Sequence, residues 1–207
     1  MIELDLQFTR DLEPVVIHDP MVDRTTSGEG TVAKLSFREI RQWDAGSWFD
    51  SAFERERVPS LGQVLDQVRP SGVDLLIELK ESHLLMRGCR RVVEEILRAE
   101  MGSRCILQSF ELEAVRRLHD LAPGLRCAAL YQTATPDYVG EAMSVGADYL
   151  VLSRKLAGDF VVQDAHRNGF QVFVWTVDAP AEIRRMIDLG VDGIISNYPE
   201  RVFRELG

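Results

Sequence analysis

Hydrophobic and polar positions follow two different periods along the chain, and the two alternate from residue 59 to the C-terminus. Short apolar runs rich in β-branched residues are typical of strands, and longer runs with apolar residues three and four apart are typical of helices. We expect strands at 2–8, 74–80, 105–110, 125–130, 148–153, 171–177 and 193–197. We expect helices near 60–69, 83–101, 111–121, 136–145, 157–168, 180–189 and 199–206.

The order of these elements indicates the fold class. Strands that alternate with helices form βαβ units and a parallel sheet. Runs such as residues 149–152 are apolar on both faces, as in strands covered on each side. No Gly-x-Gly-x-x-Gly motif follows the first strand, which disfavours a dinucleotide-binding sheet. We predict an α/β fold of TIM (β/α)8 type in one domain over 1–207, incomplete, with seven βα units and the first unit missing.

Residues 9–59 interrupt this rhythm. They hold a short apolar run at 14–17, a turn-rich segment at 27–30, and Ser36 with Glu39 in the spacing of a capping box. We interpret the segment as a structured insertion after the first strand. In a barrel, loops that follow strands carry functional groups.

Charged residues two positions apart mark the first and second expected strands of the barrel. Glu3 and Asp5 share one face of the first strand, and Glu78 and Lys80 share one face near the end of the second. Carboxylates that converge at the mouth of a barrel suit a hard divalent cation, Mg²⁺ or Ca²⁺. Lys80 beside them favours a phosphate group next to the metal. The spacing leaves a second interpretation open, a salt-bridged polar layer without metal.

Two further residues are candidates for the same site. His18 follows a strand-like run and could act as a general acid or base, or be a structural loop residue. Trp175 ends an expected strand, where its indole fills the core or forms one wall of a substrate pocket. Spacing does not decide between these alternatives. The other histidines lie in expected helices and are read as structural.

Composition excludes some partners. The net charge of −9 and the pI near 5.0 argue against a general nucleic-acid surface, whose affinity comes from basic residues. The cysteines Cys89, Cys105 and Cys127 have no CxxC spacing and are expected to be buried free thiols, which fits a reducing compartment. The chain has neither an apolar run long enough to span a membrane nor a signal-peptide pattern. We expect a cytoplasmic protein.

Taken together, these motifs resemble the glycerophosphodiester phosphodiesterases over residues 2 to about 200. The matching elements are, in order, Glu3-Leu-Asp5, Thr9-Arg-Asp11, Val15-Val-Ile-His-Asp19, Asp23-Arg-Thr-Thr26 with Gly28 and Gly30, Pro59-Ser-Leu61, Ile77-Glu-Leu-Lys80, Ser109-Phe110, Trp175-Thr-Val177 and Gly190-Val-Asp-Gly-Ile-Ile195. Single elements such as Trp-Thr-Val are weak. The ordered set of Glu-x-Asp, His-Asp, Asp-Arg-Thr-Thr and Glu-x-Lys is specific.

The resemblance implies a function in lipid and glycerol metabolism. The family is a TIM barrel that hydrolyses glycerophosphodiesters to glycerol 3-phosphate and an alcohol with a divalent cation. By position, the metal ligands would be Glu3, Asp5 and Glu78. His18 would be one of two catalytic histidines, Lys80 a phosphate contact and Trp175 a wall of the glycerol pocket.

The chain also departs from the family pattern. The family opens with a strand ending in His-Arg-Gly and a segment containing Pro-Glu-Asn-Thr, which supply the second catalytic histidine, a phosphate-binding arginine and another acid. These 207 residues contain neither element. We expect that an internal start or a gene fragment explains the difference and that hydrolysis by this chain is impaired.

Two alternatives to an impaired hydrolase follow. The first is an inactive remnant that still binds metal and phosphate, and the second is a lipid phosphodiester lyase of the same superfamily. Missing the first strand would also leave the opening and last strands unpaired on one side, and open strand edges pair with other chains. We therefore expect either direct closure of a seven-stranded barrel or a homo-oligomer that covers the open edge.

Overall fold

A computed structural model describes all 207 residues, and the chain divides into two compact units. The first unit comprises residues 1–107 and 120–126, and the second comprises 108–119 and 127–207. The single domain expected over 1–207 stays a prediction.

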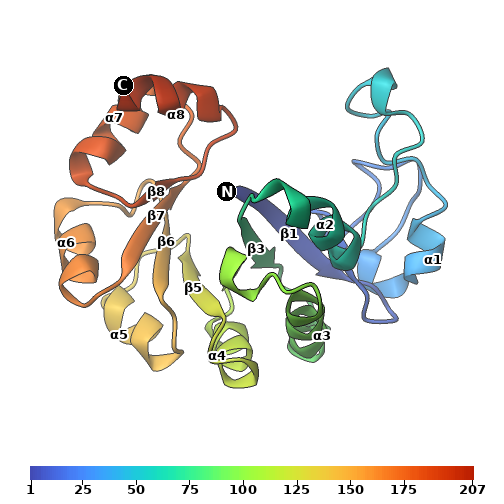
Figure 1. Cartoon of the computed structure of the whole chain (residues 1–207), viewed down its shortest axis with the longest axis horizontal. Coiled ribbons are helices and arrows are strands. Elements are labelled where there is room, and N and C mark those ends of the chain that lie inside the picture. The colour runs from blue at the N-terminus through green and yellow to red at the C-terminus, as the bar shows by residue number, and fades with distance from the viewer. The chain divides into compact units, whose positions relative to one another are not determined.

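Strand β1 (Ile2–Phe8) is the centre of the first unit (Figure 1). It pairs in parallel with β3 (Leu75–Leu79) and in antiparallel fashion with the short β2 (Pro14–Val16), so the strand order begins β2-β1-β3. Strand β4 (Cys105–Ser109) follows β3 in that order. The helices in this part of the chain are α1 (Phe37–Ile40), α2 (Leu61–Val68) and α3 (Leu85–Arg98).

The second unit repeats a strand–helix pattern. Its strands pair in chain order and in parallel. They are β5 (Arg126–Tyr131), β6 (Tyr149–Ser153), β7 (Gln171–Trp175) and β8 (Gly193–Ile194). Fully buried aliphatic side chains on β6 and β7 pack against the helices that cover these strands in Figure 1. The helices from residue 112 onward are α4 (Leu112–Leu121), α5 (Tyr138–Ser144), α6 (Asp159–Arg167), α7 (Pro180–Leu189) and α8 (Pro199–Leu206).

The seven strands expected from periodicity are all present, and one expectation about an open strand edge is wrong. The opening strand is not open along its whole outer side, because β2 pairs with Leu6–Phe8. Coverage of the rest of that edge by a second copy stays a prediction. The helix expected near 83–101 is α3, which ends at Arg98; Glu100 then takes the left-handed conformation at φ 57°, and Gly102 begins a 3₁₀ turn.

The insertion is structured, as expected. Its buried aliphatic residues form an apolar cluster with the half-buried Trp43 and Phe37 beside it. Ser36 and Glu39 make the predicted capping box at the start of α1. The cluster is built from β2 and the residues that follow, namely Val15, Ile17, Val22, Val32, Ile40 and Val58. The three cysteines are buried and form no disulfide, as expected, and burial raises the pKa of the Cys105 thiol to about 11.

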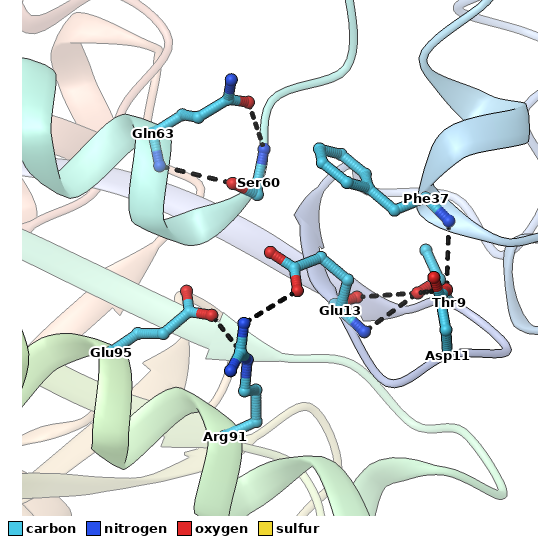
Figure 2. Close-up of polar contacts among 8 residues, drawn as sticks. All are labelled: Thr9, Asp11, Glu13, Phe37, Ser60, Gln63, Arg91 and Glu95. Atoms are coloured by element: carbon cyan, nitrogen blue, oxygen red, sulfur yellow. Dashed lines mark hydrogen bonds and ion pairs between the residues drawn. The ribbon is translucent and has the colours of Figure 1, made fainter.

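A polar network holds the turn between β1 and β2 against α3 (Figure 2). The Thr9 hydroxyl donates to Asp11 Oδ1 at 2.6 Å and accepts the Glu13 backbone N–H at 2.9 Å. Arg91 of α3 then donates from Nη2 to Glu13 Oε2 at 3.1 Å, and its Nε lies 2.8 Å from Glu95 Oε1. Asp11 also accepts the backbone N–H that opens α1. The turn is therefore bonded both to α3 and, through the start of α1, to the rest of the insertion.

Glu95 makes the stability of this network depend on pH. The side chain is 3% exposed, and burial, together with the nearby Glu13 charge, raises the pKa of Glu95 despite Arg91. Because the native state then binds the proton more tightly than the unfolded chain, stability falls as pH rises above the ordinary value of 4.5. We expect Glu95→Gln to match the wild type in urea unfolding at pH 4.5 and to exceed it at pH 7.

The exposed neighbour Glu94→Gln is the control and should keep the wild-type pH dependence. Identical pH slopes in the wild type and Glu95→Gln would show that the buried carboxyl does not titrate in this way.

Gly88 lets α3 approach β1 closely. A Cβ at this position would lie 2.2 Å from the ring of the fully buried Phe8, so the ring or the helix must move. We expect Gly88→Ala to lower the free energy of unfolding by about 1–2 kcal/mol, with overpacking outweighing the gain in helix propensity. Gly124→Ala is the control, because its Cβ would meet nothing within 4 Å. Equal unfolding midpoints in the two variants would refute the close-approach argument.

Candidate metal centre

Three carboxylates converge where β1 and β3 pair. Glu3 and Asp5 lie on one face of β1, and the parallel register sets Asp5 directly beside Glu78 of β3. Oxygen atoms of all three side chains lie within 4.8 Å of one another. Glu78 is buried, at 6% exposure, and the two acids of β1 are partly exposed. The expected convergence of these three residues is confirmed.

Lys80 places a positive charge among the acids. Its Nζ lies 2.9 Å from Asp5 Oδ1 and 2.6 Å from Glu78 Oε1, and its backbone N–H donates to Leu6 O at 3.0 Å. Burial raises the pKa of Glu78, and the ammonium group opposes that shift. Burial also disfavours the charged lysine, but its bonds to both carboxylates raise the pKa of Lys80.

The donor set fits a divalent cation. One lysine balances one of the three carboxylate charges, and the remaining negative charge is concentrated in a small volume. Oxygen ligands from carboxylates are those preferred by Mg²⁺ and Ca²⁺. The alternative interpretation is a salt-bridged polar layer without metal. Lys80 does form ion pairs with Asp5 and Glu78, but one lysine does not neutralise three carboxylates.

The β1–β2 hairpin brings His18 to the same place. The backbone N–H of Ile17 donates to Asp5 O at 3.1 Å, so the next residue lies beside the acids. Gln7, buried and on the same face of β1 as Glu3 and Asp5, donates from Nε2 to His18 O at 3.1 Å. Sequence reasoning missed Gln7, although its position two residues after Asp5 is the signal that reveals it.

Asp19 and Arg24 form a second layer of contacts around the histidine. His18 Nδ1 lies 2.8 Å from Asp19 Oδ1. Asp19 also accepts from Arg24 Nε at 2.5 Å and Nη2 at 3.0 Å, and the Arg24 hydrogen bond holds the pKa of Asp19 far below its usual range. Both residues lie in the His-Asp and Asp-Arg-Thr-Thr motifs, but neither had an assigned role.

A cleft of ≈ 420 Å³ opens over these groups, and the insertion forms one of its walls. The side of the cleft formed by β1 and the hairpin carries Glu3, Asp5 and His18. The other side, called here the insertion side, is formed by the part of the insertion that follows the hairpin and carries two arginines and an exposed tryptophan. The lining residues are Glu3, Leu4, Asp5, Val16, Ile17, His18, Arg24, Thr25, Ala45, Trp48, Arg57, Val58 and Pro59.

Trp175 lies in the second unit, at the end of β7. Its ring packs edge-to-face against Phe110 with centroids 5.8 Å apart. Its indole N–H is shielded from solvent and meets no acceptor.

No helix of the chain is both long and apolar enough to cross a membrane.

Comparison with known proteins places these features in one family. The model of the glycerophosphoryl diester phosphodiesterase family matches residues 1–201. A glycerophosphodiester phosphodiesterase of Caldanaerobacter subterraneus is 37% identical over 205 residues, covering 96% of this chain and 82% of that protein. One from Bacillus subtilis is 29% identical over 222 residues, covering 96% of this chain and 74% of that protein.

Known structures agree with the family match. A glycerophosphodiester phosphodiesterase from Agrobacterium tumefaciens superposes with a TM-score of 0.82 at 27% identity, covering 97% of this chain and 85% of that one. The structure of an Oleispira antarctica phosphodiesterase in complex with the product sn-glycerol-3-phosphate gives a TM-score of 0.93 at 23% identity, covering 99% of this chain and 83% of that one. The predicted fold class, an α/β barrel of TIM type, is confirmed.

Lys80 should stabilise the metal-free protein. Lys80→Met would leave Asp5 and the buried Glu78 facing each other without a cation. We expect a loss of about 3 kcal/mol in the free energy of unfolding at pH 7 in EDTA, as when one partner of a buried ion pair is removed. The exposed Lys155→Met is the matched control, with a change within about 0.5 kcal/mol. Equal stability of the two variants would contradict the ion-pair role.

Proposed function

The chain belongs to the glycerophosphoryl diester phosphodiesterase family, and we propose that it uses a divalent cation to hydrolyse glycerophosphodiesters to glycerol 3-phosphate and an alcohol. The observation that carries the proposal is the convergence of Glu3, Asp5 and Glu78 beside His18 and Lys80. Relatives that align with nearly the whole chain are glycerophosphodiester phosphodiesterases.

The three carboxylates would hold Mg²⁺ or Ca²⁺. When bound, such a cation polarises phosphoryl oxygens and lowers the pKa of an attacking hydroxyl or water. Lys80 lies in contact with two of the three proposed ligands, so its ammonium group is placed to bind a phosphate oxygen beside the metal. A monoanionic diester would then meet two cationic groups, the metal and the ammonium group of Lys80.

His18 would transfer the proton. With Nδ1 paired to Asp19, Nε2 is the ring nitrogen that exchanges a proton with the attacking or leaving oxygen. Arg24 keeps Asp19 ionised and oriented, because it binds both carboxylate oxygens. Gln7 donates a hydrogen bond to the backbone carbonyl of His18. Hydrogen bonds to its ring and to its backbone carbonyl therefore both position the histidine.

Trp175 belongs to the second unit, and its assignment as a wall of the glycerol pocket stays a prediction. An indole N–H removed from water without an acceptor is unfavourable in a purely structural residue.

Turnover by these 207 residues should be slow. His18 is the one histidine among the residues that line the cleft, and each general acid or base contributes about 10²–10⁴-fold. The same observation favours a second function, binding of metal and phosphate without turnover.

Release of glycerol 3-phosphate from glycerophosphocholine tests the proposal. We expect weak activity with Mg²⁺ or Ca²⁺, its loss in EDTA, and a further decrease of about 10²–10⁴-fold in His18→Ala. The exposed His83→Ala should behave as the wild type. The melting temperature should rise with added cation in the wild type and His18→Ala but not in Asp5→Asn.

The outcomes separate the two functions. Cation binding with no turnover by the wild type would support the binding function over the hydrolase. Activity that persists in EDTA, or a cation response that persists in Asp5→Asn, would contradict the metal site.

A further inference from the structure

We propose that Arg57 selects the leaving alcohol, favouring glycerophosphodiesters whose alcohol is a polyol or carries negative charge over those that carry choline. The inference rests on the proposed function, since it assigns the insertion side of the same cleft to the alcohol.

Arg57 is a cation that the protein does not neutralise. It lines the cleft and is half-buried. Its Nη1 donates to the backbone carbonyl of Gln42 at 3.1 Å, and its guanidinium forms no ion pair with a carboxylate. A fixed guanidinium with donors to spare is suited to hydroxyl or anionic oxygen atoms.

Arg24, the other arginine of the cleft, differs from Arg57 because it is ion-paired and lies over an aromatic ring. Arg24 is paired with Asp19, and its Cζ lies 5.9 Å from the centre of the Trp48 ring. Trp48 is the aromatic group that lines the cleft, and aromatic rings are what a quaternary ammonium binds in proteins. Because a guanidinium already lies over this ring, choline would have to compete with it.

The acids of the cleft do not reverse this preference. Glu3 and Asp5 are assigned to the cation, and Asp5 also pairs with Lys80. The unpaired positive charge on the insertion wall therefore repels a cationic alcohol. One unit charge a few ångströms from another near a protein surface changes an equilibrium by about tenfold.

Substrate ratios test the assignment. In the presence of Mg²⁺, we expect the wild type to have a kcat/KM for glycerophosphoinositol about tenfold above that for glycerophosphocholine. Arg57→Ala should bring the ratio near one, Arg57→Lys should keep discrimination against choline, and Arg57→Glu should reverse the preference. Arg55→Ala, an exposed neighbour outside the cleft, is the control and should keep the wild-type ratio.

Where turnover is slow, the preference between the two substrates is measured from their dissociation constants. Dissociation constants for both substrates, measured by calorimetry in the His18→Ala background with and without Arg57→Ala, should shift in parallel with kcat/KM. An equal loss for both substrates in Arg57→Ala would make Arg57 a general phosphate contact and overturn the selection, as would equal use of both by the wild type. Failure of the wild type to bind or hydrolyse either substrate would instead contradict the proposed function, and this inference with it.

Discussion

The candidate site depends on the register in which β1 and β3 pair. With Leu4 beside Ile77 and Asp5 beside Glu78, the acids of two strands that are distant in sequence meet on one face. The alternate positions include the buried Leu4 and Leu6 of β1 and three buried aliphatic residues of β3, so a slip of one residue would expose those side chains and bury the charges. Packing of the apolar face therefore specifies the geometry of the polar one.

That register brings three negatively charged side chains together, and a neighbouring lysine partly offsets their repulsion. Lys80 follows Glu78 by two residues, directly after the end of β3, so the pairing of β1 with β3 brings in both the last acid and the lysine that contacts it. The partly exposed acids of β1 line the cleft, and Glu78 beside Asp5 is buried. A cluster with one lysine for three carboxylates retains affinity for a second cation.

Most of the fold could be predicted from the sequence, because strand and helix periods are local properties. The convergence of Glu3, Asp5 and Glu78 followed from the same periods, since parallel neighbouring strands end at one edge. Other features depend on tertiary partners that no local pattern specifies. The three residues of β2 read only as a short apolar run, and the pairing of Arg91 with Glu13 joins positions that are 78 apart. Arg57 looked like one charge among many in its loop, because its lack of a carboxylate partner is visible only in three dimensions.

The hairpin of β1 and β2 has a consequence for how the site assembles. Two of the three acids and the histidine come from one contiguous segment of eighteen residues, joined by antiparallel pairing across a short turn. Closing so short a loop costs little chain entropy, whereas β3 must return across more than fifty intervening residues to add Glu78. The proton-transfer group and the first carboxylates therefore belong to a low-contact-order element that is able to form early. The rate at which a cation site appears during refolding would be set by the docking of β3.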